Sequence, residues 1–346
     1  MGKSERRKMK ERQTFVCDVL VIGGSLEGCI AALEVSREGK KVLLAEEGGA
    51  LGGMASGGLM TYIPLQQADS AKVREYAENI LRDASEQPGQ STEDCTLFND
   101  QKLKVVLRRM LDAAGVTVLT HVYPADMLWR EDASSKLPAG LRFCTKNGWL
   151  NVEASVVIDG TDLTEAGCMA GLAWKKGRGC AVAGVKFNGI GTDSLRLAAA
   201  SILEETRESL TGTVVCGFSA DRGDLKLYTE RLLFLHSRCL GETVLYGLSA
   251  DLKAVDCFTL SDARAGLRIL AYRLRDWMRE NLEGFGEADI IHVAPLISCY
   301  GLRIFDSNPY DTLILLNQHT KEYDNINAIA AGIEGAGKAL GRIELG

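Results

Sequence analysis

The stretch FVCDVLVIGGSLEG, residues 15–28, decides the fold of this chain. Its first part, residues 15–22, is an apolar, β-branched run of the kind buried on both faces of a parallel sheet. The glycine turn at residues 23–28 is followed by a predicted helix over 29–38 and a predicted strand over 40–45, which ends beside Glu46. A strand, a glycine turn, a helix, a second strand and an acidic residue within about 30 residues indicate a βαβ unit that binds a dinucleotide.

Individual residues of this unit have distinct expected roles. Gly23 permits the tight turn, and Gly28 lets the helix pack closely on the strand. The helix N-terminus offers N–H groups and a positive dipole end to a pyrophosphate. Glu46 is placed to accept both hydroxyls of an adenosine ribose, and its charge disfavours a 2′-phosphate. Ser25 replaces the middle glycine of the pattern, so we expect its Cβ to crowd the pyrophosphate and its hydroxyl to donate a compensating hydrogen bond.

Composition limits the class of protein. The chain has 346 residues, of which 46% are hydrophobic and 25% charged, as in an ordinary globular protein. A net charge of −6 argues against nucleic-acid binding, and no apolar run reaches the roughly 18 residues of a membrane span. The 10 cysteines are scattered without a CxxC pair, which predicts free thiols in a reducing cytoplasm and no metal site. Residues 1–14 are basic and polar and are predicted to form a disordered leader.

A glycine-rich loop follows Glu46. Residues 48–60 contain six glycines in thirteen positions, which would allow backbone to lie close along an extended flavin. Together with residues 18–28 and 42–46, the loop LGGMASGGL at 51–59 resembles the FAD-dependent oxidoreductase family. More narrowly, it resembles the glutathione-reductase-like flavoproteins with two dinucleotide-binding domains and an LGGMA loop.

The resemblance implies FAD as the cofactor and assigns its site residue by residue. The implied cofactor-binding residues are Gly23, Gly24, Ser25, Leu26, Glu27, Gly28, Glu46, Glu47, Gly52, Gly53, Met54, Ala55, Val122, Gly160, Thr161 and Gly332. The turn Gly160-Thr161-Asp162 lacks the glycine that relatives have after the threonine.

The expected fold class is α/β, with a Rossmann-like FAD-binding domain containing a parallel sheet and a β-meander, and an inserted α+β cap. The FAD-binding domain is expected over 15–165, with the meander at 116–158, and again over 315–346, with a closing strand at 324–332 and a helix from 335. The cap, or substrate domain, is expected over 166–314. Within it the pattern predicts helices at 194–210, 224–235 and 261–281, and strands at 213–218, 243–248 and 289–294.

The resemblance implies hydride transfer between the flavin and a small-molecule substrate that enters between the cap and the glycine loop. Arg303, Tyr300 and His292 are the candidate catalytic residues, and Cys299 is the candidate reactive thiol. Two alternatives stay open: a degenerate, non-catalytic partner subunit, and a binder of an NAD-derived adduct like the thiazole synthases. A homo-oligomer is compatible with either reading.

Overall fold

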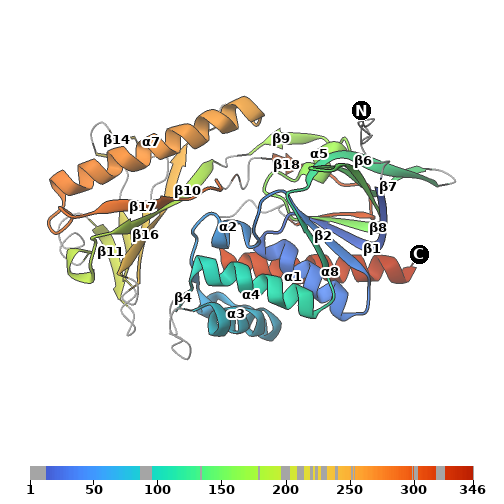
Figure 1. Ribbon diagram of the computed structural model, residues 1–346, viewed down its shortest axis with the longest axis horizontal. Helices are drawn as coiled ribbons and strands as arrows, with labels where there is room; N and C mark the ends of the chain where they lie inside the picture. The colour runs from blue at the N-terminus through green and yellow to red at the C-terminus, as the bar shows by residue number, and fades with distance from the viewer. Residues whose placement is uncertain are drawn as a thin grey trace, which may run out of the picture.

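The two largest sheets lie at opposite ends of an elongated molecule (Figure 1). The computed structural model describes residues 13–85, 96–132, 135–177, 180–195, 203–208, 214–218, 221–222, 225–226, 232–237, 241–250, 252, 254–297, 299, 303–316 and 324–345. Both ends of the described chain belong to the unit that contains the first sheet (Figure 1).

The first sheet has seven strands in the order β5-β2-β1-β8-β7-β6, and β19 also pairs with β8. Its parallel strands are β1 (Gln13–Ile22), β2 (Val42–Glu46), β5 (Thr117–Thr120), β8 (Gly148–Asp159) and β19 (Leu313–Leu315). The antiparallel strands β6 (Tyr123–Asp132) and β7 (Ser135–Thr145) complete the predicted meander together with β8. Because β8 pairs with β1 along its length, the meander is continuous with the parallel sheet.

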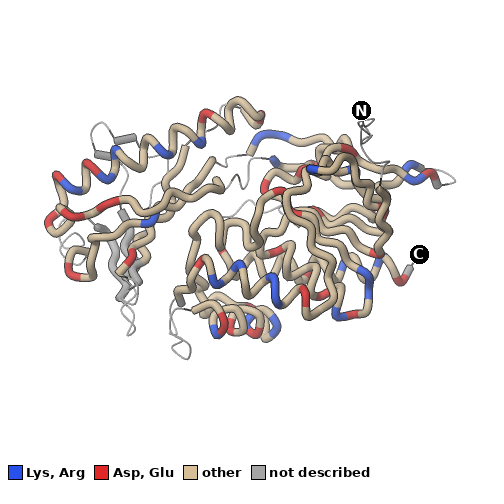
Figure 2. The backbone as a smooth tube through the Cα atoms, viewed as in Figure 1, with Lys and Arg blue, Asp and Glu red and all other residues tan. Residues whose placement is uncertain are grey.

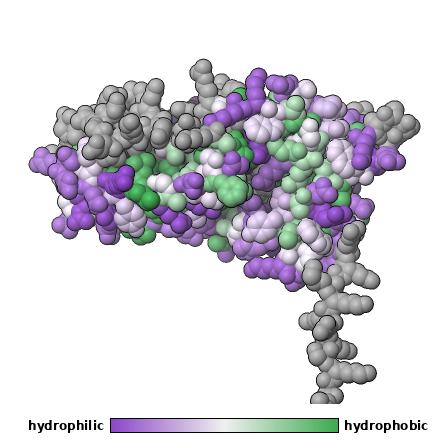
Figure 3. All heavy atoms as spheres, turned by 90° about the horizontal axis from the view of Figure 1, so that it is seen from above, coloured by the Kyte–Doolittle hydropathy of each residue, from purple (hydrophilic) through white to green (hydrophobic). Residues whose placement is uncertain are grey.

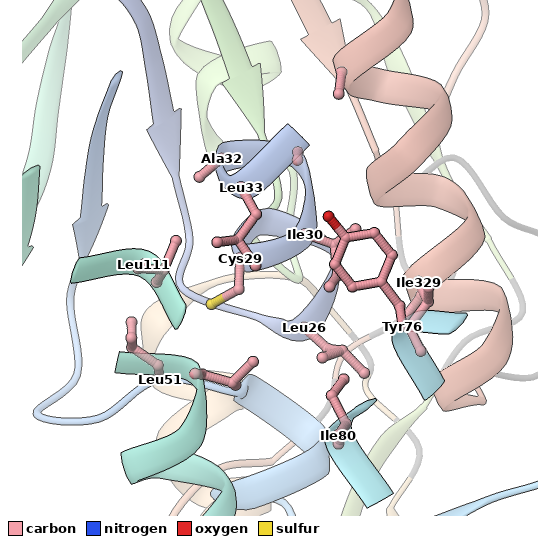
Figure 4. Packing of buried hydrophobic residues seen from close by; sticks show 14 of the residues in the cluster. Leu26, Cys29, Ile30, Ala32, Leu33, Leu51, Tyr76, Ile80, Leu111 and Ile329 are labelled. Atoms are coloured by element: carbon pink, nitrogen blue, oxygen red, sulfur yellow. The ribbon is translucent and has the colours of Figure 1, made fainter. Parts of the chain in front are cut away.

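Helix α1 (Leu26–Arg37) forms the centre of the layer beneath this sheet. Around it lie α3 (Ala71–Ala84), α4 (Asp100–Ala113) and α8 (Asn325–Leu345). Figure 4 shows Cys29 and Ile30 of α1 among Tyr76 of α3, Leu111 of α4 and Ile329 of α8. Residues 26–35 of α1 are all buried, which explains why most of them are apolar or small, although Glu27 and Glu34 are among them.

The second sheet has six antiparallel strands in the order β11-β12-β15-β16-β10-β17. They are β10 (Ala181–Asn188), β11 (Leu203–Glu208), β12 (Val214–Phe218), β15 (Leu232–Ser237), β16 (Glu242–Ala250) and β17 (Asp289–Val293). The long helix α7 (Cys257–Asn281) packs on this sheet through Leu267, Leu274 and Met278, which recur at helical spacing.

The structure describes further short elements. They are α2 (Gly53–Ser56), β3 (Tyr62–Ile63), the 3-10 turn η1 (Leu65–Gln67), β4 (Thr96–Leu97), α5 (Glu165–Met169), β9 (Trp174–Lys176), β13 (Asp221–Arg222), β14 (Leu225–Lys226) and β18 (Arg303–Phe305). One ion pair between the units joins Lys186 of β10 to the buried Asp100 of α4 at 3.0 Å, and Lys186 also contacts Glu242 at 3.0 Å. The amide of Leu296 donates to the carbonyl of Gly57 at 3.4 Å, which ties the segment after β17 to the glycine loop.

The surface mixes charges and apolar groups. Figure 2 shows both charge signs along α7. In its sequence, Arg264, Arg268, Arg273 and Arg275 lie between Asp262 and Asp276. Seen from above, apolar side chains occupy separate areas among polar ones (Figure 3), and α7 exposes Phe258, Ile269 and Tyr272. Within the described residues, no helix has both the length and the apolar character needed to cross a bilayer.

Three expectations about secondary structure are wrong. Of the helix expected at 194–210, residues 194–195 are helical but 203–208 form β11. In the helix expected at 224–235, the described residues form β14 and β15 instead. Pairing of β11 with β12, of β14 with β13 and of β15 with β16 satisfies their backbone groups. The closing strand expected at 324–332 belongs to helix α8. There the carboxylate of Asp324 accepts a hydrogen bond from the amide of Asn327 at 2.6 Å and so caps the first turn. The closing strand is β19 instead.

Other expected elements are confirmed, among them β1, α1, β2, β12, β16, α7 and β17. Of the leader expected over residues 1–14, Gln13 and Thr14 belong to β1, and residues 1–12 lie outside the described part of the chain. The cysteines that the structure describes as free include Cys17, Cys29 and Cys299.

Candidate functional site

Four neighbouring parallel strands end at one edge of the first sheet. Strand β1 ends at Ile22, β2 at Glu46, β5 at Thr120 and β8 at Asp159, and the strands run parallel in register. The segments that follow these strands contain most of the predicted cofactor-binding residues. Ligands of open parallel sheets bind outside the carboxyl ends of the strands, so this edge is the candidate site.

The turn between β1 and α1 requires its glycines. Gly23 has a φ of +85°, and a Cβ built on it would lie 2.6 Å from the carbonyl carbon of Gly160. A Cβ on Gly28 would lie only 2.1 Å from the carbonyl oxygen of Gly23. Both obstacles are backbone atoms, which cannot move aside as a flexible side chain can. The predicted roles of these two glycines in turn and packing are therefore confirmed by the geometry.

Ser25 caps helix α1 rather than pointing a free hydroxyl at the site. Its Oγ accepts a hydrogen bond from the amide of Gly28 at 3.2 Å and donates one to the carbonyl of Gly160 at 2.9 Å. The Ser25 hydroxyl has one proton, and here Gly160 receives it, so the expected donation to a pyrophosphate would require this hydrogen bond to be released.

Glu46 organises the end of β2. Its Oε2 accepts a hydrogen bond from the amide of Gly24 at 2.5 Å, and its Oε1 accepts one from the amide of Gly48 at 2.6 Å. Burial raises the pKa of this carboxyl above its ordinary value, while the two amides act in the opposite direction. A carboxylate has about four lone-pair positions. Two therefore remain for ribose hydroxyls, and Glu46 is a suitable acceptor for them.

The glycine loop lies directly against the first turn. The amide of Gly52 donates to the carbonyl of Gly24 at 2.7 Å, and Gly52 pairs with Ser25 as a parallel bridge. A Cβ on Gly53 would lie 3.0 Å from the Cα of Ser25. Met54 and Ala55 of α2 are fully buried behind this contact.

The segment after β5 lies against the end of β2 and the start of the glycine loop. The amide of Val122 donates to the carbonyl of Glu46 at 3.2 Å, and the amide of His121 donates to the carbonyl of Gly48 at 3.1 Å. Of the predicted cofactor-binding residues here, Val122 is buried and Glu47 is exposed.

Asp159, a residue that the sequence pattern did not single out, organises the end of β8. It is fully buried, and its carboxylate accepts four hydrogen bonds: from Thr161 Oγ1 at 2.6 Å, Thr161 N at 3.0 Å, Ala166 N at 2.7 Å and Gly167 N at 3.3 Å. Burial nevertheless raises its pKa above the ordinary value. The signal for this role was an aspartate at the end of an apolar strand, where a carboxylate can cap the helix that follows.

Glu165 of α5 is a second residue that the sequence pattern missed. Its pKa is raised to about 8, first by burial and then by the negative charges of Glu47, Asp159 and Asp162, with the guanidinium of Arg303 acting in the opposite direction. A half-buried carboxyl with this pKa exchanges a proton near neutral pH. No local sequence signal indicates it, because its neighbours come from three separate segments.

The two predicted catalytic residues that the structure describes, Arg303 and His292, are not brought together. Arg303 of β18 donates from Nη1 to the carbonyl of Leu163 at 2.7 Å, and its guanidinium lies 5.1 Å from the centre of the Trp174 ring. His292 is exposed on β17, opposite Lys186 of β10. Tyr300 lies outside the described residues.

Burial and packing explain two further predicted residues, Cys299 and Gly332. Cys299 is buried, and its burial raises the pKa of the thiol to about 12, so the thiol stays protonated and unreactive at neutral pH. Gly332 lies within α8, where a Cβ would be 2.5 Å from the carbonyl oxygen of Glu27. It therefore permits close packing of α8 on α1 instead of ending a strand.

The edge has the parts that a dinucleotide requires. The close-packed glycines bring backbone to the strand ends, α1 directs its N-terminus to the same place, and Glu46 offers carboxylate oxygens beside it. These residues fit a dinucleotide such as FAD.

Comparison with known proteins agrees with this assignment. The family model described as FAD dependent oxidoreductase matches residues 18–298, and it confirms the resemblance found in the sequence. The thiamine thiazole synthase of Methanococcus vannielii is 28% identical over 211 residues, which cover 59% of this chain and 76% of that protein.

Solved structures share the fold at low identity. A geranylgeranyl bacteriochlorophyll reductase-like protein from Thermoplasma acidophilum aligns with a TM-score of 0.60 at 16% identity, covering 96% of this chain and 80% of its own. Aklavinone-11 hydroxylase, solved with FAD and aklavinone, aligns with a TM-score of 0.62 at 14% identity, covering 97% of this chain and 63% of its own. These likenesses establish the α/β fold with a Rossmann-like cofactor-binding sheet.

Proposed function

This chain belongs to the FAD dependent oxidoreductase family, and from that premise we propose that it transfers a hydride between FAD and a small-molecule substrate. Its cofactor is FAD. The observation that supports this most is Glu46, whose two carboxylate oxygens are fixed by backbone amides at the end of β2, beside the N-terminus of α1. That arrangement is preorganised to hold a ribose next to a pyrophosphate.

The cofactor would be held along the edge described above. The N-terminus of α1 would bind the pyrophosphate, Glu46 the ribose, Val122 the adenine, and the loop at Gly52 and Gly53 the extended part of the flavin. When bound, the flavin supplies a hydride donor and acceptor at its ring nitrogen N5. The chain itself binds, orients and excludes water.

We propose that the second unit, expected over residues 166–314, is the cap that selects the substrate. Met54 and Met60 of the glycine-loop region pack against Tyr246 of β16, with Tyr62 and Val182 beside them. Methionine side chains adapt to irregular apolar shapes, so this contact is suited to open around a small, largely apolar substrate. Arg303 and His292 remain candidate substrate-facing residues, with Tyr300.

The absorption spectrum of the purified protein, followed by chromatography of the nucleotide released by heat, tests the proposal. We expect flavin bands and released FAD, and a lower FAD content in Glu46→Ala and Glu46→Gln. Glu46→Gln keeps one carbonyl acceptor for an amide, and circular dichroism checks that both variants are folded. Wild-type protein that stays colourless after incubation with excess FAD would contradict the proposal.

The similarity to thiamine thiazole synthase supports a second candidate, a protein that holds an adenine dinucleotide adduct without flavin. The same chromatography separates the two functions. An adenine nucleotide without a flavin chromophore in the supernatant would favour the second candidate, and FAD would favour the first.

A further inference from the structure

Leu59, near the end of the glycine loop, has a backbone conformation that leucine rarely adopts. Its φ is +63°, in the left-handed region, and its side chain is 1% exposed. We propose that Leu59 is a positioning residue, which anchors the glycine loop in the core of the second unit and so holds the loop in the form that seats FAD. This inference rests on the proposed function, because the same loop is assigned to the flavin.

The side chain of Leu59 is part of the core of the second unit. It shares a buried hydrophobic cluster with Ala183 and Val185 of β10. The approach is close, since a Cβ built on Gly184 would lie 2.7 Å from the Cβ of Leu59 and 2.6 Å from the carbonyl oxygen of Gly58. A side chain at position 184 would therefore push β10 and the loop apart.

The backbone next to Leu59 is held by the first unit, which contains the seven-stranded sheet. The amide of Met60 donates a hydrogen bond to the carbonyl of Met54 at 3.0 Å. The carbonyl of Met60 accepts one from Nδ2 of Asn325, the fully buried first residue of α8, at 2.8 Å. The loop backbone and the Leu59 side chain are thus fixed to different units.

The left-handed conformation of Leu59 depends on both attachments. A bulky residue keeps a positive φ only where its surroundings over-determine it. If the side chain is shortened, the attachment to the second unit is lost and the backbone is free to leave the left-handed region. The same loop contains Gly52, which pairs with Ser25 at the β1–α1 turn, so its rearrangement should weaken the binding of FAD.

Hydrogen exchange of the FAD-free chain, measured by mass spectrometry, tests the anchor itself. We expect the amides of residues 51–60 to exchange about tenfold faster, or more, in Leu59→Ala than in the wild type. Leu267→Ala is the matched control, because it makes the same change at an equally buried residue of the same cluster, on α7, and should leave this exchange unchanged. Leu59→Met keeps a long apolar side chain and should restore slow exchange. Urea unfolding checks that each variant is folded.

Titration with FAD, followed by flavin fluorescence, tests the positioning role. We expect Leu59→Ala to bind FAD about tenfold more weakly than the wild type, because a loop that is no longer fixed must be ordered on binding. Leu267→Ala and Leu59→Met should stay within about twofold of the wild type. Leu59→Val, whose β-branch resists a positive φ, is the second variant should Leu59→Ala fail to fold, and it should show both changes.

The outcomes separate the anchor, the positioning role and the proposed function. Unchanged loop exchange in folded Leu59→Ala would overturn the anchor. Faster exchange with unchanged FAD affinity would overturn the positioning role. An equal loss of affinity in Leu267→Ala would overturn it too, because the cause would then be the stability of the second unit as a whole. Faster loop exchange in Leu59→Ala, with no FAD binding by the wild type or any variant, would support the anchor and overturn the proposed function.

Discussion

Glu165 is the residue whose charge should most affect stability near neutral pH. We expect Glu165→Gln to be more stable than the wild type, by an amount that grows as the pH rises from 6 to 8. The reason is that the folded chain raises the pKa of this carboxyl from 4.5 to about 8, chiefly by burial and then by the charges of Glu47, Asp159 and Asp162. Glutamine has nearly the same shape and removes the ionisation.

The direction follows from linkage. A carboxyl whose pKa is higher in the folded chain than in the unfolded chain stabilises the fold fully below its unfolded pKa. This contribution is lost as the pH rises through the folded pKa, because the unfolded chain loses the proton more readily. Ionisation of Glu165 should therefore lower the free energy of unfolding between pH 4.5 and about 8. At about 1.4 kcal/mol per pKa unit, the whole window has an upper limit of about 5 kcal/mol. Because the side chain is only half-buried, solvent screening reduces this to roughly 2 kcal/mol, of which about 1 falls between pH 6 and pH 8.

The assay is urea unfolding of the cofactor-free protein, followed by circular dichroism at pH 6 and at pH 8. Glu153→Gln is the control, since Glu153 is an exposed residue of β8 and its substitution should change neither midpoint. The reasoning would be refuted if Glu165→Gln and wild type differed by the same free energy at both pH values, or if the wild type gained on the variant at pH 8.

Two further predictions concern packing and the contact between the units. Gly28→Ala should destabilise the fold by about 3 kcal/mol or more, because its Cβ would lie 2.1 Å from the Gly23 carbonyl oxygen; thermal unfolding measures this, and a normal melting temperature would contradict it. Lys186→Met should cost about 2 kcal/mol in urea unfolding, because the buried Asp100 loses its 3.0 Å partner but keeps Gln101 at 2.5 Å and Lys104 at 3.7 Å. Asp100→Asn in the same chain should restore part of the loss. An unchanged midpoint for Lys186→Met, or no recovery in the double variant, would show that this ion pair does not hold the two units together.

Much of the candidate site could be predicted because it is local. The glycines at 23 and 28 and the acid at Glu46 lie within one βαβ unit, whose periodicity and turn chemistry are visible in about 30 residues. The location of the site also follows from such units, since parallel strands bring their carboxyl ends to one edge of the sheet.

Other features of the site depend on residues that are distant in the chain. The proton of the Ser25 hydroxyl goes to Gly160, and the pKa of Glu165 depends on charges from Glu47 and Arg303. Ser25 and Gly160 meet because β8 lies beside β1 in the sheet. No local pattern can indicate a desolvation or a Coulomb interaction of this kind.

The sequence by itself determined the βαβ unit, its acidic residue and the family of the chain, because these depend on short-range periodicity and on glycines that the turn requires. Only the tertiary structure decided that residues 203–208 and 232–237 are strands, that α8 begins at Asn325, and that Asp159 caps α5. The physical reason is that a short segment with mixed propensity takes the conformation whose backbone and polar groups find partners, and those partners are supplied by distant parts of the chain.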